Sequence, residues 1–116
     1  MTGAGPDPRP RMTEAGGLAG ARCEACGYAV AFPRPRCPRC RGELAPAEFG
    51  PGGTVWASTV VHVPVPGVEP PYGLAYVDLD DDGPRVLVHT GGEAPLPVGA
   101  RAELAAPDSL GNLRAR

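Results

Sequence analysis

The sequence predicts an all-β protein in two parts, a small zinc ribbon followed by a five-stranded β-barrel. Three observations support this fold class. All four cysteines lie in one short segment, "CEACGYAVAFPRPRCPRC", as two Cys-x-x-Cys pairs. The 116 residues include 17 glycines and 16 prolines, which favour turns and short strands over long helices. Short β-branched or alternating segments follow the cysteines and are separated by loops rich in Gly and Pro.

The composition narrows the classes of protein to consider. The formal net charge of −2 argues against a protein whose whole surface binds nucleic acid. The N-terminal segment lacks the apolar core of a secretion signal, and no segment approaches the roughly 20 apolar residues that span a membrane. We therefore expect a soluble, cytoplasmic protein without membrane contact. In that reducing compartment, cysteines of this spacing favour metal binding over disulfides.

The first segments of the chain are expected to be a flexible arm, residues 1–17, and the zinc ribbon, residues 18–43. Four thiolates satisfy tetrahedral Zn²⁺, and Cys-x-x-Cys brings two sulfurs to one ion. Gly27 directly follows the first pair and allows the backbone to turn beneath the sulfurs, whereas Gly42 stands one place late after the second pair. The predicted ligands are Cys23, Cys26, Cys37 and Cys40. Four thiolates leave no open coordination position, so the zinc is expected to be structural.

Iron is the alternative metal, because rubredoxin, a one-iron electron carrier, also uses two such pairs. Its pairs lie far apart in sequence, whereas only ten residues separate the pairs of this chain. The short spacing is typical of a zinc ribbon.

The barrel is predicted over residues 44–106, with a frayed tail over 107–116. Five segments read as strands, which is the number that an OB-fold needs: 44–49, 53–65, 72–80, 85–90 and 100–105. In the second of these, strict alternation places Val55, Ala57 and Thr59 on one face and Trp56 on the other. The residues "DDGP" between the third and fourth strands predict a tight hairpin turn.

Four arginines cluster on the ribbon, at positions 34, 36, 39 and 41. Guanidinium groups fork onto phosphate oxygens, so Arg34, Arg36, Arg39 and Arg41 are candidate phosphate ligands. The alternative is a solvated surface that offsets the negative charge of the thiolate site.

Other polar and aromatic residues carry weaker signals. The segment "DLDDDG" begins like a calcium-binding EF-hand loop, but His89 stands where the loop needs Glu, so an acidic hairpin tip is the better interpretation. His62 and His89 lack the neighbours of a catalytic dyad, and we expect exposed strand histidines. The aromatic residues of the strands are predicted to pack in the core or at the barrel rim, with base stacking as the alternative: Trp56, Tyr72 and Tyr76.

Three motifs occur in a characteristic order along the chain. The first is C-x-x-C-G…F-P…C-P-x-C over 23–40, the second is G-x-V-x-x-x-T-V-V-H over 53–62, and the third is P-Y-x-x-A-x-V-x-L-D over 71–80. In this order they resemble the rubredoxin-like zinc-ribbon plus OB-fold family catalogued as domain of unknown function thirty-five. The resemblance covers about residues 18–105.

The resemblance implies a function, because members of that family accompany thiolase-fold enzymes that process acyl-CoA. It implies a non-catalytic accessory subunit that docks on a thiolase-superfamily enzyme and helps to enclose acyl-CoA, a CoA thioester. The ribbon arginines are then candidates for the CoA phosphates. Two other hypotheses remain open: a nucleic-acid-binding OB-fold module, which the net charge disfavours, and a rubredoxin-like electron carrier.

Overall fold

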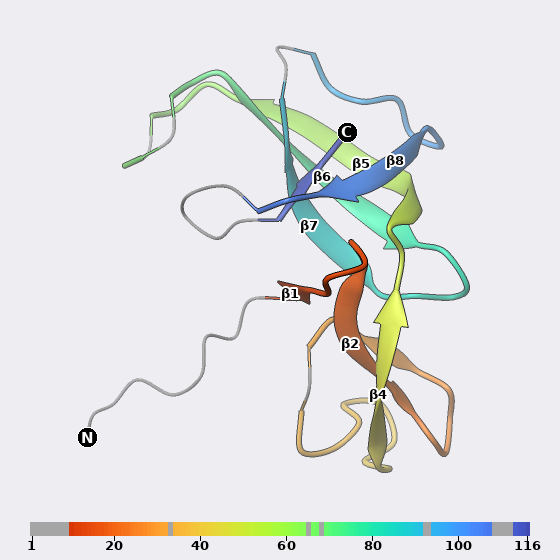
Figure 1. The fold of residues 1–116 in the computed structure, drawn as a ribbon. Coiled ribbons are helices and arrows are strands. Elements are labelled where there is room, and N and C mark those ends of the chain that lie inside the picture. The colour runs from red at the N-terminus through yellow and green to blue at the C-terminus, as the bar shows by residue number, and fades with distance from the viewer. Residues whose placement is uncertain (1–9, 33, 65, 68, 92–93, 108–112) are drawn as a thin grey trace, which may run out of the picture.

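The regular elements found in the described residues are all β-strands, as the sequence predicts (Figure 1). They form a four-stranded sheet followed by a closed five-stranded barrel. No helix long and apolar enough to cross a membrane occurs in the part of the chain that the structure describes. This computed structural model describes residues 10–32, 34–64, 66–67, 69–91, 94–107 and 113–116.

The ribbon sheet is built around its second strand. Its strands are β1 (Arg11–Met12), β2 (Leu18–Cys23), β3 (Ala29–Val30) and β4 (Leu44–Phe49). β2 pairs antiparallel with the other three, and its whole length pairs with β4. The assignment of residues 44–49 to the barrel was therefore wrong. Leu44 instead pairs with Cys23, so β4 continues the ribbon directly out of the second cysteine pair.

The expected flexible arm differs from the structure in its second half. Residues 1–9 lie outside the described residues. Arg11 and Met12 pair with Ala19 and Leu18 as β1, and Thr13 closes the turn by accepting a hydrogen bond from the N–H of Gly16 and donating one to the carbonyl of Gly17. Backbone pairing thus ties residues 11–17 to the ribbon, an effect that side-chain periodicity does not reveal.

The barrel follows the order β5-β6-β7-β9-β8. Its strands are β5 (Gly52–Val61), β6 (Tyr72–Leu79), β7 (Arg85–Thr90), β8 (Arg101–Ala105) and β9 (Arg114–Ala115). β9 runs parallel to β7 and antiparallel to β8, and so closes the barrel. The prediction of a frayed tail was therefore wrong for its last residues. Leu113 and Ala115 are buried, but two residues are too few to show a strand period in the sequence.

A β-bulge at Trp56 changes the faces of β5. Val55 pairs with Val77 and Ala57 pairs with Tyr76, so one extra residue stands on β5 opposite two consecutive residues of β6. Val55 is buried, whereas Ala57 takes the same outer face as the exposed Tyr76. Strict alternation therefore placed Val55 and Ala57 wrongly on one face.

One hydrophobic core joins the two parts. Most of its side chains come from the barrel, and the ribbon adds Leu18, Ala29 and Phe49. Leu18 is fully buried, which is worth roughly 1.5–3 kcal/mol for a side chain of its size. In Figure 1, β2 and β4 lead from the cysteine end of the ribbon to the barrel. The ribbon is thus attached to the barrel through packed side chains as well as through the chain itself.

Candidate functional site

The four cysteine sulfurs converge at the end of the ribbon sheet. Their Sγ atoms all lie within 4.8 Å of one another. The Sγ atoms of Cys23 and Cys40 are 3.4 Å apart, and those of Cys26 and Cys37 are 3.8 Å apart. Thiolates at about 2.3 Å from a tetrahedral zinc ion lie about 3.8 Å from one another. The donor set and its spacing therefore fit one tetrahedral zinc ion.

The two cysteine turns have the same backbone geometry with different residues. The N–H of Gly27 donates to the carbonyl of Cys23 at 3.0 Å, and the N–H of Arg41 donates to that of Cys37 at 2.8 Å. Both residues have positive φ, 79° for Gly27 and 66° for Arg41. Only Gly adopts this conformation without strain, so the second turn is the less favourable one.

Gly42 has a different role from a turn residue. A Cβ atom at this position would lie 3.1 Å from the Sγ of Cys23 and 3.2 Å from that of Cys40. The missing side chain of Gly42 therefore leaves room for the sulfur cluster, which explains a glycine one place later than the turn itself needs.

Backbone N–H groups point at three of the sulfurs. Those of Ala25 and Cys26 lie 3.4 Å from the Sγ of Cys23, and those of Arg39 and Gly42 lie 3.4 Å from Cys37 and Cys40. Such donors stabilise thiolates. The N–H of Cys26 is the main cause that lowers the pKa of Cys23 to about 6.

The pKa values of Cys37 and Cys40 are shifted in opposite directions. Burial works against the Cys37 thiolate, but backbone N–H groups still lower its pKa. The N–H of Gly42 favours the Cys40 thiolate, yet the neighbouring Cys23 and Cys26 sulfurs raise the pKa of Cys40 to about 12. Metal binding requires thiolates, so filling this site releases protons and is favoured by rising pH.

The structure separates the four ribbon arginines into two pairs. Arg34 stacks over Phe32, with its guanidinium carbon 4.8 Å from the ring centroid, and Arg39 lies 5.8 Å from the centroid of Tyr28. Arg36 and Arg41 are exposed on the same segment. Arg34 and Arg39 line hollows of the surface, whereas Arg36 and Arg41 line none of those described below.

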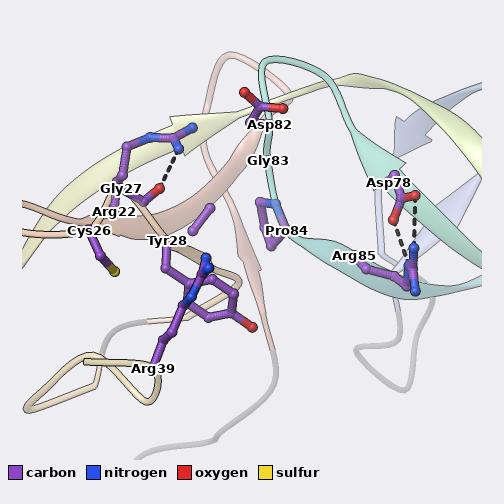
Figure 2. A pocket seen from close by; sticks show the side chains of 11 residues that line it. Arg22, Cys26, Gly27, Tyr28, Arg39, Asp78, Asp82, Gly83, Pro84 and Arg85 are labelled. Atoms are coloured by element: carbon purple, nitrogen blue, oxygen red, sulfur yellow. Dashed lines mark hydrogen bonds and ion pairs between the residues drawn. The ribbon is translucent and has the colours of Figure 1, made fainter. Parts of the chain in front are cut away.

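Two adjoining hollows, called here the trough, lie between the ribbon and the barrel. Their volumes are about 680 and 240 Å³, and they share Tyr28, Ala29, Pro84 and Arg85. Figure 2 shows the larger hollow, with Arg39 and Tyr28 on the ribbon side and Asp78, Pro84 and Arg85 on the barrel side. Arg22 of β2 and Arg85 of β7 also line the trough, and sequence patterns did not identify them, because only the contact of the ribbon with the β6–β7 turn brings them together.

The arginines of the trough differ in whether their guanidinium groups are already engaged by hydrogen bonds or ion pairs within the chain. Arg22 donates at 2.8 Å to the carbonyls of Gly27 and Asp81, and so links the ribbon to the β6–β7 turn. Arg85 forms a two-point ion pair with Asp78, at 2.6 and 3.1 Å, which raises the pKa of Arg85. Arg39 has no ion-pair partner among the described residues. Arg34, which lines the smaller hollow, has none among those residues either, so Arg34 and Arg39 are the trough cations best able to take an anionic ligand.

The aromatic residues of the strands do not pack as predicted. Trp56 is 51% exposed and Tyr76 is 44% exposed, so both lie on the outer wall of the barrel. Their rings meet edge to face, with centroids 6.0 Å apart. The prediction of core or rim packing was wrong for these two because each lies on the outer side of its strand, Trp56 next to the buried Val55 and Tyr76 between the buried Ala75 and Val77. Tyr72 is half-buried and stacks on the ring of His89 at 5.9 Å.

The remaining polar candidates from the sequence are the two histidines and the acidic tip. His62 is exposed just beyond β5, and His89 is half-buried. The acidic tip is a hairpin turn in which Asp81 and Asp82 have positive φ of 62° and 55°. Asp80 pairs with Arg101 at 2.6 Å, much as Asp78 pairs with Arg85. Two carboxylates of the calcium-like segment are thus engaged by arginines.

Comparison with known proteins matches both parts of the chain. Residues 14–45 match the family described as the rubredoxin-like zinc ribbon domain of ChsH2, and residues 47–106 match that described as the C-terminal OB-fold domain of ChsH2. A solved structure described as "Ltp2-ChsH2(DUF35) aldolase" is 29% identical, with a TM-score of 0.67. The match covers 85% of this chain and 81% of that chain. The resemblance to domain of unknown function thirty-five is confirmed.

Proposed function

The chain belongs to the ChsH2 family of rubredoxin-like zinc ribbon and OB-fold domains, and from this premise we propose that it is a non-catalytic accessory subunit of an acyl-CoA enzyme. The observation that carries the proposal is the similarity, across both parts, to a chain of the Ltp2-ChsH2(DUF35) aldolase structure. The proposed partner is an enzyme of the thiolase superfamily, which the motif resemblance implies. The partner supplies the catalytic groups, and this chain supplies a docking surface and part of the ligand site.

The four cysteines are proposed to bind one zinc ion with a structural role. When bound, this ion crosslinks the two cysteine turns, and structural zinc sites have apparent binding free energies of about 10–16 kcal/mol. Cys23, Cys26, Cys37 and Cys40 fill a tetrahedral shell, so the site has no position for substrate. The family match of residues 14–45 supports this role.

The trough is proposed to receive the anionic part of acyl-CoA. The phosphates of CoA need guanidinium donors, and its adenine ring and pantetheine arm need aromatic or apolar surface. Arg39 and Arg34 supply the first, and Tyr28 and Phe32 supply the second within the same two hollows. The structure therefore favours Arg34 and Arg39 over Arg36 and Arg41 among the four arginines selected from the sequence.

The accessory role is tested by isolating the complex and rebuilding it. The tagged chain is purified gently from its native host, and the enzyme that accompanies it is identified by mass spectrometry. That enzyme is then produced alone and assayed for solubility and turnover with and without this chain. We expect both to depend on the chain. An enzyme that keeps full activity and solubility alone contradicts the proposal.

The CoA role is tested with a matched pair of ribbon variants. Arg39→Gln removes a cation from the trough, and Arg36→Gln removes one from the exposed surface beside it. Calorimetric titration of the rebuilt complex with CoA is expected to show about tenfold weaker binding for Arg39→Gln only, because one charge-assisted hydrogen bond is lost. Equal affinities for the two variants would place the CoA phosphates elsewhere.

A further inference from the structure

The outer wall of β5, β6 and β7 carries an apolar surface, called here the outer face. Its most exposed large side chains are Trp56, Tyr76 and Leu87, at 51%, 44% and 47%. A hollow of about 290 Å³ opens on it, with a mostly apolar lining: Ala57, Ser58, Thr59, Leu74, Ala75, Tyr76 and Leu87. The outer wall of a barrel in water normally carries polar side chains. The outer face therefore has the composition of a binding surface.

The centre of the outer face is held in a defined geometry. Tyr76 pairs with both Ala57 and Leu87 across the strands, and its ring meets Trp56 at an interplanar angle of 73°. The guanidinium carbon of Arg85 lies 3.8 Å from the centroid of the Trp56 ring. Trp, Tyr and Arg are the residues that most often dominate binding energies at protein interfaces. Ordering them before binding lowers the entropic cost of docking.

The charge of the outer face favours a protein over a nucleic acid. Asp78 neutralises Arg85 through two contacts, so the cation that stacks on Trp56 is already paired. The two trough arginines without an ion pair among the described residues and best able to take an anion, Arg34 and Arg39, line the trough and not the hollow of the outer face. Single-stranded nucleic acid needs unpaired cations along its backbone as well as aromatic rings for its bases. An apolar protein surface needs only the rings, Leu87 and Leu74.

The outer face is continuous with the trough. Arg85 lines both hollows of the trough and also stacks on Trp56. A partner that covers the outer face therefore reaches the edge of the trough. An acyl-CoA ligand held in the trough would then lie beside the partner, which is the placement that a shared ligand site requires.

We infer that the outer face is the surface on which the catalytic partner subunit docks, through an apolar surface of its own, with Trp56 and Leu87 as the main anchors. This inference rests on the proposed function, because it assigns the partner of that function to a named surface. A second copy of this chain and a single-stranded nucleic acid are the competing occupants.

The test measures assembly of the rebuilt complex with three variants of the chain. Trp56→Ser and Leu87→Ser remove the anchors, and Val98→Ser is the matched control, because Val98 is 74% exposed outside the outer face. By surface plasmon resonance we expect the Kd for the partner to rise at least about 30-fold for each anchor variant, as for interface hot spots, and to stay unchanged for Val98→Ser. Zinc content and thermal unfolding of the isolated variants check that each is folded.

The possible outcomes distinguish failure of the docking inference from failure of the proposed function on which it rests. If wild-type chain binds no enzyme, the proposed function fails and the inference fails with it. If wild type binds and both folded anchor variants bind equally well, the proposed function stands and only the inference is overturned. Unfolding of one anchor variant leaves the other to decide, since Trp56 and Leu87 lie on different strands.

The sole tryptophan gives a direct test of the competing occupants. The chain contains one Trp, so 5-fluorotryptophan labelling yields a single ¹⁹F signal from the outer face. We expect this signal to shift on addition of the partner, and to stay unchanged on addition of oligothymidylate or on concentration of the chain alone. A shift with oligothymidylate, or a dimer in sedimentation that Trp56→Ser abolishes, assigns the face to a different occupant and overturns the inference.

Discussion

The ribbon and the barrel are held together by different means. The ribbon between its cysteine pairs buries little beyond Ala29, Val30 and two of its own metal ligands. The barrel buries an apolar side chain at almost every inward position of five strands. A segment of the ribbon's size cannot fold on apolar burial alone, so its order depends on the metal. One short chain thus combines a part whose order depends on a metal with a part that is held by its hydrophobic core. The two parts are joined through Leu18 and Phe49.

Removal of a metal ligand should have the largest effect. In Cys37→Ser, one of the four sulfurs is lost from a cluster whose members lie within 4.8 Å. We expect elemental analysis to show one zinc ion per wild-type chain and almost none in the variant, with ribbon amides losing their protection from hydrogen exchange while β6 and β7 amides keep theirs. Arg36→Gln is the control, since Arg36 is exposed. Iron in place of zinc would contradict the choice of metal, and simultaneous loss of protection in both parts would contradict the division between ribbon and barrel.

Truncation of the side chain that joins the two parts should come next. Leu18 lies on β2 but is fully buried in the common core, so Leu18→Ala should lower the free energy of unfolding by about 2–5 kcal/mol. Chemical denaturation of the zinc-loaded protein measures this. If the parts are coupled through Leu18, the variant weakens zinc binding as well as the barrel. A loss confined to the ribbon would show that the barrel core does not depend on it.

The two cysteine turns offer a smaller and more local comparison. Gly27→Ala places a side chain at φ 79° and should destabilise the zinc-loaded protein by about 1 kcal/mol. Arg41→Gly relieves the same strain at φ 66° and should stabilise the protein by a similar amount. Thermal unfolding of the two variants should therefore shift in opposite directions. Shifts of the same sign would refute the account of the turns.

The smallest effect concerns a surface ion pair of the barrel. The hydrogen bond from Arg101 lowers the pKa of Asp80 below its ordinary value of 3.8. A lowered pKa in the folded state adds stability above the ordinary value, and this stability is lost as the pH falls through the folded value. Asp80→Asn should therefore destabilise the protein slightly near neutral pH and lose its effect in strong acid. Unfolding curves of the wild type and of Asp80→Asn, measured from neutral pH to strong acid, give the difference in their free energies of unfolding. A difference that stays the same at low pH would contradict the assignment of the lowered pKa to the Arg101–Asp80 pair.

The sequence was most informative where one pattern determines one contact. The spacing of the cysteines predicted the sulfur cluster, and the alternation of Ala75, Val77 and Leu79 matched the buried face of β6. Prediction from the sequence failed where one extra residue shifts the alternation of faces along a strand, and where a strand is only two residues long. The bulge at Trp56 reversed the faces of β5, and β9 was too short to detect. Side-chain periodicity carries no signal for either feature.

The trough and the outer face were beyond sequence reasoning for a different reason. The trough is formed by residues far apart in the chain, such as Tyr28 and Arg85, which only the docking of the ribbon on the barrel brings together. The outer face is formed within the barrel, where the pairing of β5, β6 and β7 places Trp56, Tyr76 and Leu87 next to one another. The arginine cluster was visible in sequence, but nothing there separates Arg39 from Arg36. Proximity across the junction of the two parts makes that distinction.

The central claim is that this chain supports a catalytic partner without performing chemistry at its own metal. The most direct measurement is the turnover of the purified partner enzyme with no added chain, with zinc-loaded chain and with cobalt-loaded chain. The account predicts low turnover in the first case and equal, high turnover in the other two, because a four-thiolate site with no open position holds structure only. Full turnover without the chain, or turnover that changes with the metal, would contradict it.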